Sequence, residues 1–271
     1  MSDSRRSERR HSTEYTNTQA HTSRLTLAQV DLLGERLRTS DTVSETDLDL
    51  LQRYQAEHAA ALAYVQARID DVLPGVSQTS RIKTIGTLHD KLRRQPTRLS
   101  QVQDIAGVRI VRDMNRVEQN RIVEELRQAF VGSRVVDRRA RPTYGYRAVH
   151  VIVRHGRCNV EIQVRTHMQS LWADVVERLA DRWGRQIRYG GLPDEPGRPI
   201  GGAMTRGGLW AIVLTLADAI ASVETGTASR QLARTAGLAP DSTVARDLNV
   251  AEQQVRQTLA LLQELVATAA L

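Results

Sequence analysis

The chain has 271 residues, with 38 Lys or Arg against 31 Asp or Glu, so its formal net charge is +7. This length suits one domain with extensions or two small ones, and the basic excess favours phosphate-rich ligands such as nucleotides, RNA or anionic membrane surfaces. The single cysteine, Cys158, excludes an internal disulfide or a zinc site of several cysteines, and it fits a reducing cytosol.

The first part of the sequence predicts a disordered basic tail followed by helices. Residues 1–23 are rich in Ser, Thr, Arg, His and Asn and hold almost no aliphatic residues. They contain no apolar signal-peptide region, so we expect a cytoplasmic location. Over residues 24–74, apolar spacing predicts helices at 25–38 and 45–73, and Pro74 ends the second.

Residues 75–190 alternate strand and helix patterns, which predicts a sheet packed by helices in an α+β fold. The expected elements are a strand ending near Arg81, a helix stopped by Pro96, a strand over 106–112, a helix over 113–130, a short strand over 133–139, two strands over 145–166, and a helix from Thr166 to Trp183. In the helix over 113–130, we expect Asp113 as N-cap and Val123, Leu126 and Phe130 on the buried face.

The last part predicts a Gly/Pro linker over 191–203 and a helical region over 204–271. Helices are expected at about 204–225 and 247–269. The apolar run 207–217 is too short to cross a bilayer, so we expect no membrane contact. The final helix has an apolar stripe close to heptad spacing, which we expect to be buried against helix 45–73, another subunit or a partner protein. The stripe comprises Leu248, Val255, Leu259, Leu262 and Val266.

The strand over residues 160–165 has an unusual polar face. Val160, Ile162 and Val164 alternate with polar residues, so one face of the strand enters a core. The other face carries an acid, an amide and a guanidinium in a row. Each polar residue of this region has an ordinary structural explanation when taken singly. Together they form three clusters: Arg81, Lys83, Thr87 and Lys91; Asp104, Gly107 and Arg109; and Gly145, Tyr146 and His150 with Glu161, Gln163 and Arg165.

These clusters favour metal-assisted phosphoryl transfer. Strand pairing would bring Asp104 near Glu161, and two adjacent carboxylates repel each other unless a cation bridges them. Hard oxygen ligands favour Mg²⁺. The basic residues around them would hold a polyphosphate, and Tyr146 offers a flat face for a base.

The motifs "RIKTIGTLHDKL", "DIAGVRI", "GYRAVH" and "VEIQVRT" occur in this order and resemble the synthetase domain of the RelA/SpoT family, the alarmone synthetases, over about residues 75–190. The resemblance implies a nucleotidyltransferase-like mixed sheet flanked by helices. It implies a GTP pyrophosphokinase-like enzyme that transfers the β,γ-pyrophosphate of ATP to the 3′-hydroxyl of GDP or GTP. Too few residues precede Arg81 for the family's hydrolase domain, so we expect a stand-alone small synthetase.

The resemblance also assigns roles to residues. Asp104 and Glu161 match the catalytic, Mg²⁺-binding acids, and Arg109 matches an arginine that is structural as much as catalytic. The residues that match the ATP side are Arg81, Lys83, Thr87 and Lys91. Those that match the acceptor side are Tyr146, His150, Gln163 and Arg165, with Arg141 beside them.

One departure leaves the acceptor open. The family has Lys-Pro-x-Gly-Tyr where this chain has "RARPTYGY", so Pro142 takes the place of the lysine and Arg141 stands one position earlier. Alternatives are therefore pyrophosphorylation of the tRNA 3′ end by a translation-blocking toxin, or an inactive nucleotide-binding regulator. The expected partners are ATP and a guanine nucleotide, with tRNA, a homo-oligomer or an antitoxin as further candidates.

Overall fold

The computed structural model describes residues 24–239 and 241–268, so the tail expected over residues 1–23 lies outside the described residues. The main helices are α1 (Leu27–Thr39), α2 (Glu45–Val72), α3 (Ile85–Arg94), α4 (Arg116–Ala129), α5 (His167–Trp183), α6 (Arg206–Thr235) and α7 (Ser242–Thr268). The strands of the main sheet are β1 (Gln78–Ile82), β2 (Ala106–Arg112), β3 (Arg134–Asp137), β4 (Val149–His155) and β5 (Cys158–Thr166).

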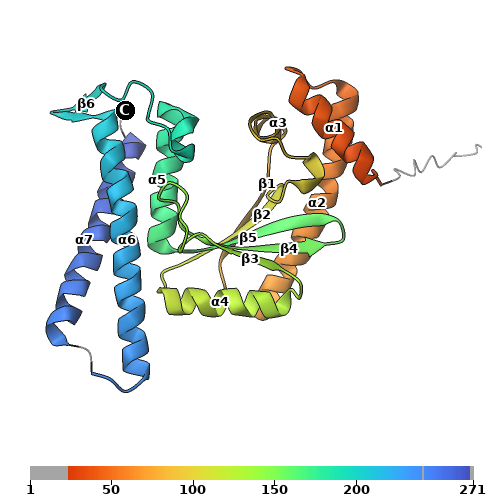
Figure 1. Cartoon of the computed structure of the whole chain (residues 1–271). Helices are drawn as coiled ribbons and strands as arrows, with labels where there is room; N and C mark the ends of the chain where they lie inside the picture. The colour runs from red at the N-terminus through yellow and green to blue at the C-terminus, as the bar shows by residue number, and fades with distance from the viewer. Residues whose placement is uncertain (1–23, 240, 269–271) are drawn as a thin grey trace, which may run out of the picture.

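The five strands form one mixed sheet in the order β1-β2-β5-β4-β3. β2 and β5 run parallel, and the other neighbouring strands run antiparallel. In Figure 1, α4 lies beneath the sheet, and α6 and α7 stand beyond α5, far from α1. This arrangement confirms the expected α+β class, with a mixed sheet flanked by helices and helical extensions at both ends.

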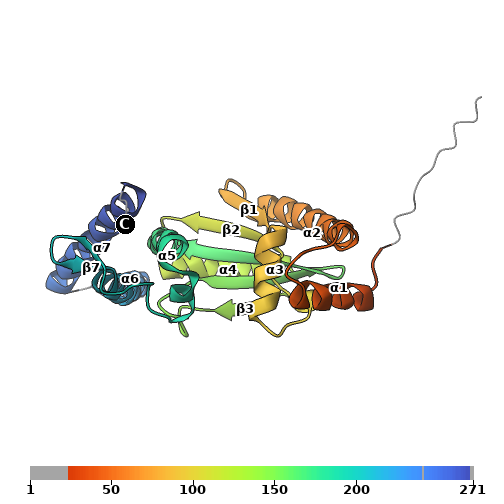
Figure 2. The ribbon, with the colours of Figure 1, turned by 90° about the horizontal axis from the view of Figure 1, so that it is seen from above.

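The two faces of the sheet differ because side chains alternate along each strand. Val108, Ile162 and Val164 point into a core that α2 and α4 cover. On the opposite face, Gly107 pairs with Glu161 across the parallel strands. Viewed from above, α3 and α5 stand over opposite ends of the strands (Figure 2). The polar face is therefore left as the floor between these two helices.

α4 begins two residues later than expected. Its N-cap is Asn115 rather than Asp113. The Asn115 side chain accepts from the N–H groups of Val117 and Glu118, and the Glu118 carboxylate accepts from the Asn115 N–H. Leu126 and Phe130 are buried as expected, but Val123 is only half-buried and Ile122 takes the inward position.

The segment expected as a linker is partly ordered by pairing. A short helix, η2 (Arg185–Tyr189), follows α5, and β6 (Pro199–Gly201) pairs with β7 (Met204–Thr205). The Asp194 N–H donates to the Trp183 carbonyl at 2.7 Å. This segment thus packs against the end of α5 and leads directly into α6.

α6 continues to Thr235, ten residues past the expected end, and by length and composition alone it is long enough and apolar enough to cross a membrane. The core helix of a soluble protein passes the same test. Here Leu209, Val213 and Ile220 are buried against α5 and α7. The expectation of no membrane contact stays a prediction.

α7 buries its apolar stripe, as expected. Val255, Leu259, Leu262 and Val266 are all buried, while Leu248 is half-buried. They pack against α5 and α6 of the same chain rather than against the long helix near the N-terminus. Contact of this helix with a second subunit or an antitoxin stays a prediction.

The α7 contact generates a stability prediction. Leu259 is 0% exposed, whereas Leu261, two residues later, is 66% exposed. Leu259→Ala should lower the free energy of unfolding by about 2–5 kcal/mol, because it removes buried methyl groups and leaves a cavity. Leu261→Ala should change it by less than about 0.5 kcal/mol. Equal effects of the two substitutions in chemical denaturation would contradict this packing of α7.

Candidate active site

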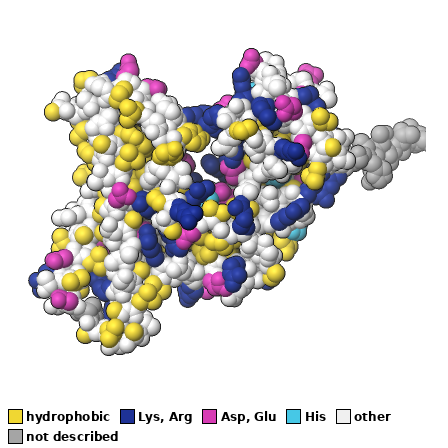
Figure 3. Space-filling view, viewed as in Figure 1, with side chains coloured by type: hydrophobic (Ala, Val, Ile, Leu, Met, Phe, Trp, Pro, Cys, Tyr) yellow, Lys and Arg dark blue, Asp and Glu magenta, His cyan; other side chains and the backbone are white. Residues whose placement is uncertain are grey.

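The polar face of the sheet forms the floor of a cavity of about 180 Å³. Its lining includes Arg81, Lys83, Asp104, Arg109, Glu161 and Gln163, together with Glu177 of α5. Figure 3 shows a hollow between the α5–α7 side and the α1–α3 side of the molecule, with Lys and Arg side chains at its base. The structure therefore brings residues of all three predicted clusters to one place.

Asp104 precedes β2 and carries two lysine contacts. Lys83 Nζ lies 2.9 Å from Oδ2, and Lys91 Nζ, in the last turn of α3, lies 2.7 Å from Oδ1. Burial alone would raise the pKa of Asp104, but the charges and hydrogen bonds of Lys91 and Lys83 outweigh it and the pKa is lowered. Asp104 is therefore ionised at neutral pH with a lysine on each oxygen.

Glu161 lies on β5, and both of its oxygens are also bound. Oε1 accepts from His150 Nδ1 at 2.8 Å, and Oε2 accepts from Gln163 Nε2 at 2.7 Å. Burial and the charge of Asp104 would raise the pKa of Glu161, but the contacts with His150 and Gln163 outweigh them and the pKa is lowered. Asp104 and Glu161 line the same cavity, as strand pairing predicted.

Hydrogen bonds extend from Glu161 to the acceptor-side residues. The Tyr146 hydroxyl lies 2.9 Å from His150 Nε2, and Arg165 Nη2 donates to that hydroxyl at 2.9 Å. The same Nη2 donates to Gln163 Oε1 at 2.8 Å. One set of proton positions satisfies all of these hydrogen bonds: the Tyr146 hydroxyl donates to His150 Nε2, and His150 Nδ1 donates to Glu161. Arg165 is thus connected to Glu161 by two routes.

The ring of Tyr146 is half-buried, and the guanidinium carbon of Arg165 lies 5.1 Å from its centroid. Burial is the main cause that raises the pKa of Tyr146. Because Arg165 occupies one face of the ring, a base can stack only on the opposite face. The expected platform role therefore stays a prediction about that second face.

Two arginines of the site, Arg165 and Arg109, differ in how they are paired. Arg165 is buried, and its Nε and Nη1 have no hydrogen-bond partner among residues 24–239 and 241–268. Arg109 reaches Asp174 at 3.6 Å and Glu177 at 3.8 Å, and its pKa is lowered by burial and then by the charge of Arg165. The unpaired N–H groups of Arg165, beside the positive charge of Arg109, favour binding of an anion such as a phosphate.

Other predicted residues lie farther out. Arg81 is exposed at the rim of the cavity, and Arg141 is exposed on the loop after β3. Thr87 is exposed, and its hydroxyl lies 2.7 Å from that of Thr84, the N-cap of α3. In this structure the Thr87 side chain is therefore bonded to the N-cap residue of α3, although the family resemblance matched Thr87 to the ATP side.

The sequence patterns missed the two α5 acids that contact Arg109. Asp174 and Glu177 stand three apart, so they share a face of α5. Their helical spacing was a usable signal, but their arginine partner lies on a strand more than sixty residues earlier.

The two carboxylates of the cavity suit a Mg²⁺ ion that is held partly by the phosphate oxygens of a bound molecule. Within residues 24–239 and 241–268, no group of three or more His, Cys, Asp or Glu side chains is placed to hold a metal ion. Asp104 and Glu161 supply carboxylates to one cavity, and Mg²⁺ is commonly bound by one or two carboxylates with phosphate oxygens and water. The residues present fit an ion that arrives with a polyphosphate.

Comparison with known sequences points to one family. Residues 80–180 match the profile described as "Region found in RelA / SpoT proteins". Uncharacterized protein Rv1366 of Mycobacterium tuberculosis is 46% identical over 144 residues, covering 51% of this chain and 53% of that protein. GTP pyrophosphokinase YjbM of Bacillus subtilis is 31% identical over 133 residues, covering 44% of this chain and 62% of that enzyme. The matched part thus spans about half the length of the mycobacterial relative.

Among solved structures, small alarmone synthetase 1 from Bacillus subtilis aligns with a TM-score of 0.49 and 20% identity, covering 68% of this chain and 96% of that chain.

The pairing of Asp104 generates a prediction for acid unfolding. Its pKa is lowered from the usual 3.8, so the unfolded chain takes up the proton first as the pH falls. The stability that this carboxylate contributes is present at neutral pH and is lost below about pH 4. In a chelator-containing buffer, Asp104→Asn should therefore lower the free energy of unfolding at pH 7 and flatten its decline below pH 4.

A matched control is Asp181→Asn, because Asp181 is an exposed acid that pairs with Arg188 at 2.9 Å away from the cavity. This variant should keep the pH dependence of the unsubstituted chain. If Asp104→Asn keeps it as well, the lysine pairing does not contribute the stability assigned to it.

Proposed function

We propose that the chain, whose residues 80–180 match the RelA/SpoT family, is a pyrophosphotransferase that makes a guanosine 3′-pyrophosphate alarmone. It would move the β,γ-pyrophosphate of ATP to the 3′-hydroxyl of GDP or GTP. The observation that carries this proposal is the meeting of Asp104 and Glu161 in one cavity lined by basic side chains. The 31% identity to a GTP pyrophosphokinase supports the same reaction.

On the ATP side, Asp104 and Glu161 would hold Mg²⁺. When bound, the ion would supply charge stabilisation to the phosphates. Lys83 lines the cavity and Lys91 is bonded to Asp104, which also lines it, and both lysines would turn from Asp104 to the phosphate oxygens. When the phosphates bind, the two lysines would exchange a carboxylate partner for phosphate oxygens, and the fold already holds both lysines in place.

On the acceptor side, the 3′-oxygen attacks the β-phosphorus of ATP, the bond from that phosphorus to the α,β-bridging oxygen breaks, and AMP leaves. Glu161 would accept the hydroxyl proton, while His150 and Gln163 hold its two oxygens in position. Arg165 would bind the acceptor phosphates through its unpaired N–H groups, and the positive charge of the neighbouring Arg109 would assist it.

A second candidate acceptor is the 3′ end of tRNA. Pro142 stands where the family has a lysine for acceptor phosphates, and the neighbouring Arg141 is exposed on the loop rather than in the cavity. An extended anion would reach such a residue more readily than a single nucleotide. Binding to many phosphates would also weaken steeply with salt. An inactive regulator is disfavoured because Asp104, Glu161 and Tyr146 are all present.

The decisive experiment supplies γ-labelled ATP, Mg²⁺ and one acceptor at a time: GDP, GTP or tRNA. We expect label on a guanine nucleotide. Asp104→Asn and Glu161→Gln should each lower turnover by roughly a thousandfold or more, because they remove several kcal/mol of charge stabilisation.

Asp181→Asn, outside the cavity, should leave the rate unchanged. Label on tRNA alone would select the second candidate, and label on no acceptor would support the inactive regulator. Near-normal turnover of either cavity variant, with the fold intact by circular dichroism, would refute the assigned metal pair.

Two substitutions of Tyr146 separate its ring from its hydroxyl. Tyr146→Phe keeps the face for stacking and loses the bonds to His150 and Arg165. Tyr146→Ala loses both. Because stacking on a base contributes about 1–3 kcal/mol, Tyr146→Ala should raise the acceptor KM roughly 5- to 150-fold and leave ATP affinity unchanged. Tyr146→Phe should retain most acceptor affinity; an effect as large as that of alanine would exclude the platform role.

A further inference from the structure

The turn that carries Tyr146 is pressed against α5 and α6. Gly145 has a φ of +87°, and a Cβ at this position would lie 2.7 Å from Trp172 Cζ2 and 3.1 Å from Ala217 Cβ. Any side chain at this position would therefore have to displace an aromatic ring of α5 or a residue of α6. Trp172 Nε1 also donates to the Val213 carbonyl at 2.7 Å, which fixes α5 to α6 beside the turn.

The residue that follows Tyr146 binds α6 directly. Arg147 is 8% exposed, and its Nη1 donates to the Gly145 carbonyl at 3.1 Å and to the Ala217 carbonyl at 3.0 Å. Its Nη2 donates to Asp218 Oδ1 at 2.8 Å. One guanidinium thus joins the turn to the backbone and a side chain of α6. Nothing in the proposed transfer reaction uses Arg147.

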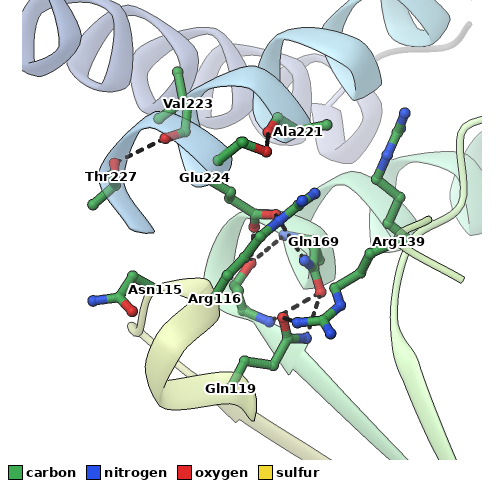
Figure 4. A network of polar contacts seen from close by, with 12 residues as sticks. Asn115, Arg116, Gln119, Arg139, Gln169, Ala221, Val223, Glu224 and Thr227 are labelled. Atoms are coloured by element: carbon green, nitrogen blue, oxygen red, sulfur yellow. Dashed lines mark hydrogen bonds and ion pairs between the residues drawn. The ribbon is translucent and has the colours of Figure 1, made fainter. Parts of the chain in front are cut away.

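A second contact joins α6 to the end of β5. Glu224 is 1% exposed and accepts from Thr166 Oγ1 at 2.5 Å, from Gln169 Nε2 at 2.8 Å and from Arg116 Nε at 3.4 Å. Figure 4 shows Glu224 reaching down from α6 towards Gln169 and Arg116. A buried carboxylate is tolerated only when donors surround it in this way. Thr166 directly follows Arg165 and caps α5.

The two contacts lie on one face of α6, because Ala217 and Glu224 are seven residues, or about two helical turns, apart. Tyr146 and Arg165 are bonded to each other, and each has a sequence neighbour that is bound to α6. A shift of α6 would therefore move both acceptor-side residues together. Lys83, Lys91 and Asp104 are not among the residues that contact α6 in this way.

We propose that α6 is the positioning element of the acceptor half of the site, and that Arg147 and Glu224 are its positioning residues. This inference rests on the proposed function, since it concerns how the same site orients its acceptor. It gives the C-terminal helices a role in acceptor affinity that is separate from ATP binding.

The test uses two substitutions that preserve charge or shape. Arg147→Lys keeps the positive charge but cannot reach three acceptors with a planar fork. Glu224→Gln keeps the size of the side chain and removes its charge. We expect each to raise the acceptor KM about tenfold, the scale for loss of a hydrogen bond to a charged group, with ATP affinity within about twofold of the unsubstituted chain.

Glu195→Gln is the matched control. It weakens the ion pairs of Glu195 with Arg198 at 3.0 Å and with Arg206 at 3.4 Å, and Arg206 lies eleven residues before Ala217 in α6. We expect it to leave both the acceptor KM and ATP affinity unchanged. All assays are made well below the unfolding temperature of each variant. Loss of folded protein would lower acceptor use and ATP binding alike, whereas misplacement of the acceptor half would lower acceptor use alone.

Hydrogen exchange gives a readout that does not require activity. The Tyr146 N–H donates to the Thr143 carbonyl at 3.0 Å, and Arg147→Lys should speed its exchange while the amides of β2 keep their protection. If exchange rises but the unsubstituted chain labels no acceptor, the positioning role stands and the proposed function fails. If exchange and acceptor KM are both unchanged in folded Arg147→Lys and Glu224→Gln, or if ATP affinity falls as much as acceptor affinity, the positioning role is refuted.

Discussion

The negative charge of Glu161 on the sheet is the constraint around which the site is organised. A carboxylate that is mostly removed from water must have donors on its oxygens, and His150 and Gln163 supply them. These two side chains are held in turn by Tyr146 and Arg165. The polar row that alternates with apolar residues along β5 is therefore a connected set, in which replacing one member changes the pairing of the next.

Asp104, the other carboxylate that lines the cavity, is paired in a different way. Asp104 is balanced by two lysines that come from different elements, so the acid and its counter-charges are assembled by the fold rather than by local sequence. Ammonium groups on flexible stems can change partners, whereas the planar guanidinium of Arg165 is fixed by a ring and an amide. The proposed ATP side is thus adaptable, and the proposed acceptor side is preorganised.

Local patterns predicted the floor of the site well. Alternation along residues 160–165 identified both faces of β5, and strand pairing correctly placed Asp104 near Glu161. Capping was less predictable, because Asp113 and Asn115 are both good caps and only the contact with Glu118 decides between them. The anchors of α6 could not be predicted, since Arg147 meets Asp218 across seventy-one residues of sequence. The only signal in the sequence for the role of Glu224 was its position as an acid among the apolar residues of α6.

The parallel pairing of β2 with β5 has a consequence for how the chain acquires its site. Ala106 pairs with Val160, so the centre of the sheet joins strands that are distant in sequence, with β3 and β4 made in between. Contacts of this kind form slowly, because a long loop must close before they contribute stability. During synthesis on the ribosome, Asp104 emerges long before its fellow carboxylate. A nascent chain therefore has no complete cavity until β5 has been translated and docked, and the contacts from α6 follow later still.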